Sequence, residues 1–205
     1  MAVKKGVKEQ KKKERRACCA KNRVWIGVGC VAFLIVLILA LVLVIRSLIA
    51  TRESRETLKQ LKACLSETVV SRDMTELVVP NNRCNDVVIL NMGAFTKLRV
   101  LSIGNECFGH VSSVKLSGLK ALERVVIGDN SFTKYKSWYN EDPDRHFYLK
   151  NCPNLKAFIL GNHAFSDYTV CEIEDVDALE VIEMGNLEGL SFSFYYASLE
   201  LKCSV

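Results

Sequence analysis

A short sequence unit recurs through the second half of the chain at a nearly fixed spacing. Four copies place a leucine six residues before a glycine: LRVLSIG, LERVVIG, LKAFILG and LEVIEMG. The steps between these marker leucines are 24, 33 and 24 residues, at Leu98, Leu122, Leu155 and Leu179. A step of 24 back from Leu98 reaches MTELVVP at Met74, the fifth copy. A fixed period of this length predicts a solenoid, in which each turn stacks on the one before.

A second apolar motif begins eight residues before each later marker leucine, at Leu90, Val114, Phe147 and Cys171. A phenylalanine closes the first motif at Phe108, Phe132 and Phe165. Six residues separate this phenylalanine from the second motif in two copies, but fifteen separate Phe132 from Phe147. The 33-residue step is therefore a 24-residue unit that carries a nine-residue insertion.

The alternation in LRVLSIG predicts a strand whose Leu101 and Ile103 point to one face. We expect the glycine that follows to allow a turn with positive φ. One turn has too little apolar surface to offset its chain entropy, whereas stacked turns bury each other's faces. The sequence therefore predicts a β-rich solenoid of about five 24-residue units over residues 72–205.

These units resemble leucine-rich repeats, and most closely the BspA-like class. ILGNHAF and VIGDNSF carry the resemblance, with NCPNL between them, and it covers about residues 74–203. The Asn or Cys of the ordinary leucine-rich unit is not clear, and the nine-residue insertion is foreign to the pattern. The resemblance implies an extended β-rich solenoid used for adhesion and recognition at cell surfaces, without catalytic residues.

Residues 24–45 form a stretch of 22 residues without a charge. A helix of this length spans about 33 Å, which matches a hydrocarbon core of about 30 Å. A cleavable signal peptide is the alternative, but its apolar region is shorter and ends at an A-x-A site, which RSLIATRE lacks. We interpret the stretch as a transmembrane helix that acts as a signal anchor.

The first 23 residues are strongly basic, with ten Lys or Arg and two Glu. The positive-inside rule predicts that this tail is cytosolic and the C-terminal domain lumenal or extracellular, at the plasma membrane or an endomembrane. We expect residues 1–23 to be disordered and to attract anionic lipid headgroups, with no nucleic-acid partner. Cys18 and Cys19 are candidates for S-acylation, and two unmodified thiols are the alternative.

Residues 46–71 place Leu58, Leu61 and Leu65 at helical spacing. We expect a stalk helix that shields the first repeat, and contact with a second copy is the alternative. At the far end a strand-like alternation runs through Leu190, Phe192, Phe194 and Tyr196. LELK at Leu199 matches the second motif, displaced by four residues, so the array ends on a bare strand or the sequence is truncated.

The insertion TKYKSWYNEDPDRH spans residues 133–146. It carries aromatic and acidic side chains of the kind that recognition loops use. The candidate binding residues are Tyr135, Trp138, Tyr139, Asp142 and Asp144. The alternative is a solvated loop with an aromatic side chain packed onto the repeats.

Six cysteines follow the apolar stretch, at positions 64, 84, 107, 152, 171 and 203. An even number permits disulfides in an oxidising compartment, although the repeat argues against most of them. Cys171 occupies an apolar position of the second motif, and Cys84 occupies the position of Phe108, so we expect both to be small buried hydrophobic residues. No C-x-x-C pair is present, so we expect no zinc site.

The sequence contains no G-x-S-x-G, Walker, G-x-G-x-x-G or H-E-x-x-H motif. We therefore expect neither an enzyme nor a cofactor or metal site. The leading hypothesis is a single-pass membrane protein whose solenoid recognises a protein or a glycan. The alternatives are a scaffold that self-associates through its stalk and C-terminal strand, and a truncated repeat protein without activity.

Overall fold

The computed structural model of the chain describes residues 2–66, 68–134, 141–186 and 191–202, with side chains from Phe33 onward. The chain divides into two compact units, Met1–Leu48 and Ile49–Val205, which are described separately. One helix, α1 (Ala2–Cys64), forms the first unit and continues into the second. The second unit contains all the strands of the described residues.

In the first unit, helix α1 has the length and apolar composition needed to cross a membrane. Its large apolar side chains from Phe33 to Ile45 are all exposed, and no protein covers them among the described residues. Phe33–Cys64 is the one such helix in the part of the chain with described side chains. An exposed apolar helix of this length is suited to a lipid environment rather than to water.

The basic tail was expected to be disordered, but it is helical in the structure. Helix α1 begins at Ala2 and includes residues 2–23. The tail is rich in Lys, Arg, Glu and Gln, which all favour helix, and it contains no proline. It also adjoins an apolar helix, so extension of that helix avoids the cost of a new nucleus. The side chains of Cys18 and Cys19 lie outside the described part, and their acylation stays a prediction.

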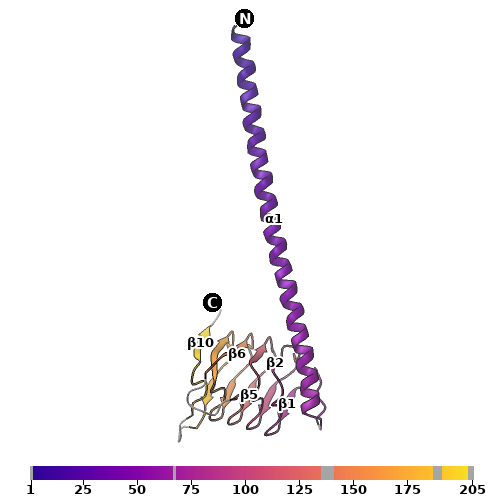
Figure 1. Cartoon of the computed structure of the whole chain (residues 1–205), viewed down its shortest axis with the longest axis vertical. Coiled ribbons are helices and arrows are strands. Elements are labelled where there is room, and N and C mark those ends of the chain that lie inside the picture. Colours follow the sequence, from indigo (N-terminus) through magenta and orange to yellow (C-terminus); the bar gives the residue numbers. More distant parts are fainter. Residues whose placement is uncertain (1, 67, 135–140, 187–190, 203–205) are drawn as a thin grey trace. The chain divides into compact units, whose positions relative to one another are not determined.

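The second unit is a β-solenoid of about five turns (Figure 1). Each turn contributes one strand to each of two parallel five-stranded sheets. Sheet A comprises β1 (Glu76–Val79), β3 (Val100–Ile103), β5 (Arg124–Ile127), β7 (Ala157–Leu160) and β9 (Val181–Met184). Sheet B comprises β2 (Ile89–Asn91), β4 (Ser113–Ser117), β6 (Asp142–Lys150), β8 (Tyr168–Glu174) and β10 (Ser198–Lys202).

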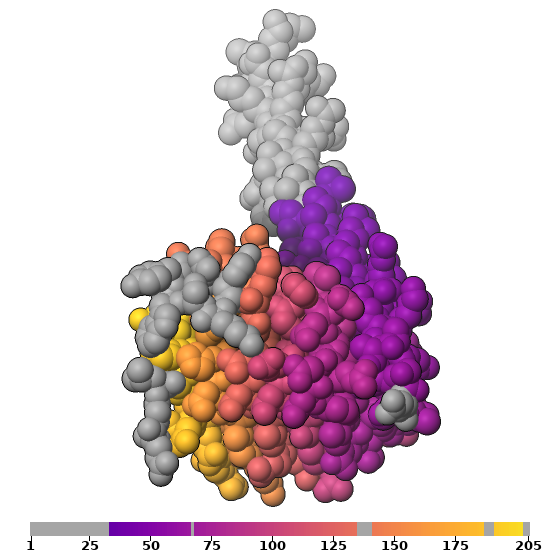
Figure 2. All heavy atoms as spheres, turned by 60° about the horizontal axis from the view of Figure 1, so that its bottom comes forward, coloured from indigo at the N-terminus to yellow at the C-terminus, as the bar shows by residue number. Residues whose placement is uncertain are grey.

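The register of the sheets reproduces the sequence repeat. In sheet A, Leu101 pairs with Leu77 and with Val125, which are 24 residues away on either side, and Val125 pairs with Phe158 across the longer step. In sheet B the first residues of the second motifs pair in succession, down to Cys171 with Leu199. Successive turns lie side by side as bands of colour in Figure 2. The predicted solenoid with a spacing of about 24 residues is therefore confirmed.

The marker leucines form one inward-pointing column. Leu98, Leu122 and Leu155 are fully buried, and Leu179 in the last turn is partly buried. Each donates its N–H to the carbonyl three residues earlier, at N–O distances of 2.9–3.1 Å. The same short turn thus places the same leucine in the core of successive turns, where burial of a leucine side chain contributes about 2 kcal/mol.

A stack of phenylalanine rings fills the arc between the two sheets. Phe108, Phe132 and Phe165 stack with ring centroids 5.0 and 4.5 Å apart, and Phe194 extends the stack at 4.7 Å. The strand expected around Phe192 and Phe194 is wrong, because both residues have positive φ and residues 193–196 form a turn. Ring stacking outweighs the local alternation there, while Leu190 lies outside the described residues.

The glycines of the repeat serve a different purpose from the one expected. Gly104, Gly128 and Gly161 do not have positive φ. A Cβ atom on Gly128 would lie 2.6 Å from the carbonyl carbon of Gly104 and 2.8 Å from the backbone nitrogen of Asn105. The previous turn therefore excludes a side chain at this position. Gly185, at the last turn, has positive φ (75°), and a Cβ atom there would meet the Ser191 side chain rather than the backbone of the previous turn.

The last part of α1, which belongs to the second unit from Ile49 onward, covers the first turn of the solenoid. Leu61 and Leu65 are buried against the core, and Thr57 is fully buried. The Thr57 hydroxyl accepts the N–H of Asn91 at 2.9 Å and donates to the carbonyl of Ile89 at 3.3 Å. The side chain thus occupies backbone groups at the free edge of β2, which would otherwise be open to another strand.

Candidate recognition surface

The insertion is the first candidate site. Of its predicted binding residues, Asp144 is exposed and Asp142 partly exposed at the start of β6. Tyr135, Trp138 and Tyr139 lie outside the described residues, so the structure does not test them. Asp142 extends β6 beyond the repeat and pairs with Tyr168 of β8, with a register shift before His146.

A buried ion pair, which we did not predict, fixes the base of the insertion. Arg145 and Asp167 are both about 1% exposed, and the Nη1–Oδ2 distance is 3.2 Å. The guanidinium also donates to the carbonyls of Gly109 and Phe132, at 3.0 and 3.1 Å. Asp167 accepts the N–H of Lys134 at 2.9 Å. Hydrogen bonds on both partners offset part of the cost of burying the charges, while the buried Arg145 Nε atom has no hydrogen-bond partner among the described residues.

Tyr168 completes this anchor beneath Arg145. The guanidinium carbon lies 4.7 Å from the centre of the Tyr168 ring, a cation–π contact. The phenol donates to the carbonyl of Val111 at 2.6 Å, and burial raises the pKa of Tyr168 above its ordinary value. The group therefore stays a neutral donor at physiological pH. We infer that the insertion leaves the solenoid from a rigid base.

The outer face of sheet A is the second candidate, and its side chains are mainly aliphatic. Residues alternate along each strand, so two columns of side chains point outward. Six of these ten positions are aliphatic: Val78, Val100, Val126, Ala157, Ile159 and Val181. Exposed fractions reach 49% at Val78 and 38% at Val181. Ser102 and Arg124 interrupt the two columns, and the aliphatic positions beside them form partly exposed patches of the kind found at interaction sites.

A row of charged residues borders this aliphatic face. Arg99, Glu123, Lys156 and Glu180 occupy the position before the strand in successive turns, and their signs alternate. Arg99 binds Glu123 with two hydrogen bonds, at 2.9 and 3.0 Å. The Arg99 hydrogen bond lowers the pKa of Glu123, so the pair stays charged near neutral pH. The border is thus polar and balanced in charge.

The outer face of sheet B is polar, and many of its charges pair within the chain. Lys150 contacts Glu172 and lies 3.2 Å from Glu174, and the Glu172 hydrogen bond is the main cause that raises the pKa of Lys150. Near the first turn, Lys115 binds Glu53 of α1 at 2.8 Å. A partner would have to displace these internal pairs, so sheet A is the better candidate surface.

An asparagine ladder, which sequence reasoning missed, runs along the turns that follow sheet A. The Oδ1 atom of Asn81 accepts the backbone N–H of Asn105 at 2.8 Å, and Asn105 binds Asp129 in the same way at 2.8 Å. Asp129 continues the ladder to Asn162, and Asn162 to Asn186. The sequence signal was present, because an Asn or Asp follows the Pro or Gly of every copy.

The cysteines divide into a disulfide and buried thiols. Cys84 lies in the phenylalanine column as expected, but it is bonded to Cys64 of α1, so the prediction of an unpaired hydrophobic residue is wrong there. The end of α1 brings Cys64 to this position, which the repeat pattern alone does not show. Cys171 is a buried free thiol, as predicted. Cys203 lies outside the described residues.

The buried thiols are poor nucleophiles. Burial raises the pKa of Cys152 to about 11 and that of Cys171 to about 12. Burial also raises the pKa of Cys107. Because the thiolate is the reactive form, these groups are unsuited to catalysis near neutral pH.

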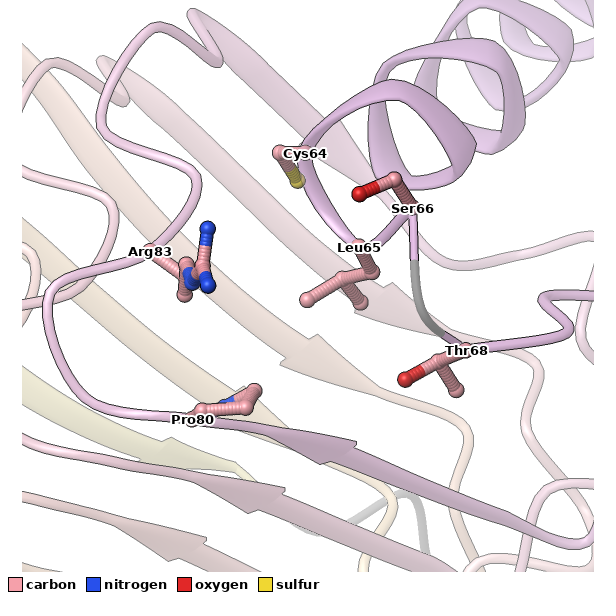
Figure 3. A pocket seen from close by; sticks show the side chains of 6 residues that line it. All are labelled: Cys64, Leu65, Ser66, Thr68, Pro80 and Arg83. Carbon is pink, nitrogen blue, oxygen red and sulfur yellow. The ribbon is translucent and has the colours of Figure 1, made fainter.

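A small cavity beside the disulfide is lined by Cys64, Leu65, Ser66, Thr68, Pro80 and Arg83 (Figure 3). Its volume of about 30 Å³ matches the space of a single water molecule, so the cavity is too small for an organic ligand. Within the part of the chain whose side chains are described, no three His, Cys, Asp or Glu side chains come together as a metal site would need.

Comparison with known proteins gave no match to a family model, to a curated protein or to a solved structure.

Proposed function

We propose that this chain is a membrane-anchored, non-enzymatic display protein whose solenoid recognises a protein or glycan through the outer face of sheet A. The observation that carries the proposal is the aliphatic outer face of sheet A, with its border of alternating charges. Aliphatic centres with polar borders are typical of protein interfaces. In this proposal Asp142 and Asp144, beside the buried Arg145–Asp167 ion pair, are additional contacts for the ligand.

The proposed topology places the basic tail in the cytosol and the solenoid in the lumen or outside the cell, at the plasma membrane or an endomembrane. The excess of basic residues before the apolar stretch supports it. The Cys64–Cys84 disulfide supports it independently, since disulfides persist mainly in oxidising compartments. Acylation of Cys18 or Cys19 and attraction of the tail to anionic lipid would strengthen the anchorage.

Membership of the BspA-like leucine-rich repeats is also part of the proposal. The 24-residue register of the strands supports it. This kinship would place the chain among surface proteins used in adhesion.

Site-specific photocrosslinking on the full chain in native membranes tests the function. With benzoylphenylalanine in place of Val126 or Ile159, irradiation should crosslink the same ligand in both variants. Val126→Lys should weaken binding of that ligand about tenfold or more. Ser117, which is exposed on sheet B, is the matched control for both the crosslinker and the lysine. Equal adduct formation from Ser117, or unchanged binding by Val126→Lys, would contradict the proposal.

A further inference from the structure

The solenoid core is open at its last turn, in contrast to its first turn. In sheet B, Leu149 and Ile173 are at most 1% exposed, whereas Leu201 in the same column is 58% exposed. In sheet A, Phe158 is fully buried, whereas its successor Ile182 is 37% exposed. The two exposed side chains line one groove of about 430 Å³, together with Ile173, Val176 and Leu179.

The last turn also leaves two backbone edges without a strand partner among the described residues. β9 ends sheet A and β10 ends sheet B, and both lie at the same end of the solenoid. The corresponding edge of β2 at the first turn is occupied by Thr57. An apolar groove between two free strand edges is the geometry that accepts added strands.

We propose that a second copy of this chain covers this end, with β10 of the two copies paired antiparallel about a two-fold axis at Leu201. A two-fold axis perpendicular to the solenoid axis brings the two copies of β10 side by side. The same axis brings the two copies of β9 side by side. The two grooves then close on each other, so one isologous contact buries both open cores. The inference does not depend on ligand recognition by sheet A.

The charge pattern of β10 selects both the partner and the register. Glu200 and Lys202 point outward and form an ion pair with each other within the strand, which the dimer would exchange for two pairs between the copies. Leu199 and Leu201 continue the inward columns of the sheet. Antiparallel pairing keeps outward residues opposite outward residues. The residue at the two-fold axis must therefore lie opposite the same residue of the second copy. An axis at Leu201 sets Glu200 opposite Lys202 twice, whereas an axis at Glu200 or Lys202 opposes like charges. An axis at Leu199 forms no ion pair from these residues.

Charge reversal on the full chain in detergent micelles tests the contact. Glu200→Lys and Lys202→Glu should each raise the dimer dissociation constant roughly tenfold, because both cross-strand pairs become repulsive. A mixture of the two single variants should restore association, because every pair is again between opposite charges. Changes within one chain cannot produce this rescue. Analytical ultracentrifugation supplies the constants, and Ser117→Lys is the control for added charge far from this end.

Oxidative crosslinking tests the register. In a Cys203→Ser background, Leu201→Cys should form a disulfide-linked dimer, because directly opposed residues lie within reach of a disulfide. Ser198→Cys in the same background should not. A monomeric chain, association indifferent to both charge reversals, or preferential crosslinking at residue 198 would overturn the proposal. Protection from hydrogen exchange, in a monomer, of those β10 amides that point away from β8 would assign the groove to another segment and overturn it as well.

Discussion

At the scale of single residues, the glycine that follows strands β3, β5 and β7 of sheet A determines how closely successive turns stack. Gly128 faces the backbone of Gly104 and Asn105 so closely that no side chain fits. The Asn105 side chain then reaches the next turn and binds the N–H of Asp129. Close approach and side-chain hydrogen bonding are therefore coupled in each turn, which explains why Gly and Asn or Asp recur together.

Gly128→Ala should lower the free energy of unfolding of the solenoid by about 1–3 kcal/mol, because its Cβ would overlap backbone atoms. Gly109→Ala is the matched control: its nearest contact would be the Asn85 Oδ1 atom, at 3.3 Å. Chemical unfolding of the full chain in detergent, followed by circular dichroism of the β-sheet, measures both. A loss at Gly128 no larger than at Gly109 would refute this steric explanation.

Residue positions were more predictable than residue roles. The repeat located the glycines, but periodicity does not report how near the adjacent turn lies, so the reason given for them was wrong. Arg145 was not identified because nothing local distinguishes a buried arginine from an exposed one. Its partner Asp167 lies 22 residues away, and only the extension of β6 brings the two together.

At the scale of elements, helix α1 closes one end of the solenoid. Thr57 occupies the edge of β2, Leu61 and Leu65 cover the core, and Cys64 is bonded to Cys84 in the first turn. The spacing of the leucines gave the correct buried face of this helix. The disulfide could not be predicted, because it joins a helix outside the repeat to a position inside it.

Cys84→Ser should lower the free energy of unfolding by about 3 kcal/mol, because the disulfide constrains the unfolded chain across a separation of 20 residues. A reducing agent should lower the unfolding midpoint of the wild type and leave that of Cys84→Ser unchanged. Cys171→Val, which keeps a buried apolar side chain, is the control and should remain sensitive to reduction. Insensitivity of the wild type to reduction would show that the bond does not support the fold.

At the scale of the whole molecule, the chain combines an apolar helix able to cross a membrane with a solenoid that depends on contacts between turns. The period, the number of turns and the apolar stretch were all readable from the sequence, because each repeats or persists over many residues. The candidate surfaces were not, since they arise from columns of residues 24 or 33 positions apart. Only the aligned strands show that Val100, Val126 and Ile159 share one face.

Protease protection on sealed membrane vesicles tests most directly whether the solenoid is displayed on the non-cytosolic side. With a tag at each terminus of the full chain, protease added outside cytosolic-face-out vesicles should remove the N-terminal tag and leave the C-terminal tag intact until detergent is added. Cys64 and Cys84 should resist alkylation before reduction in the same sample. Digestion of the C-terminal tag in intact vesicles, with both cysteines alkylated, would contradict the proposed topology and the display function with it.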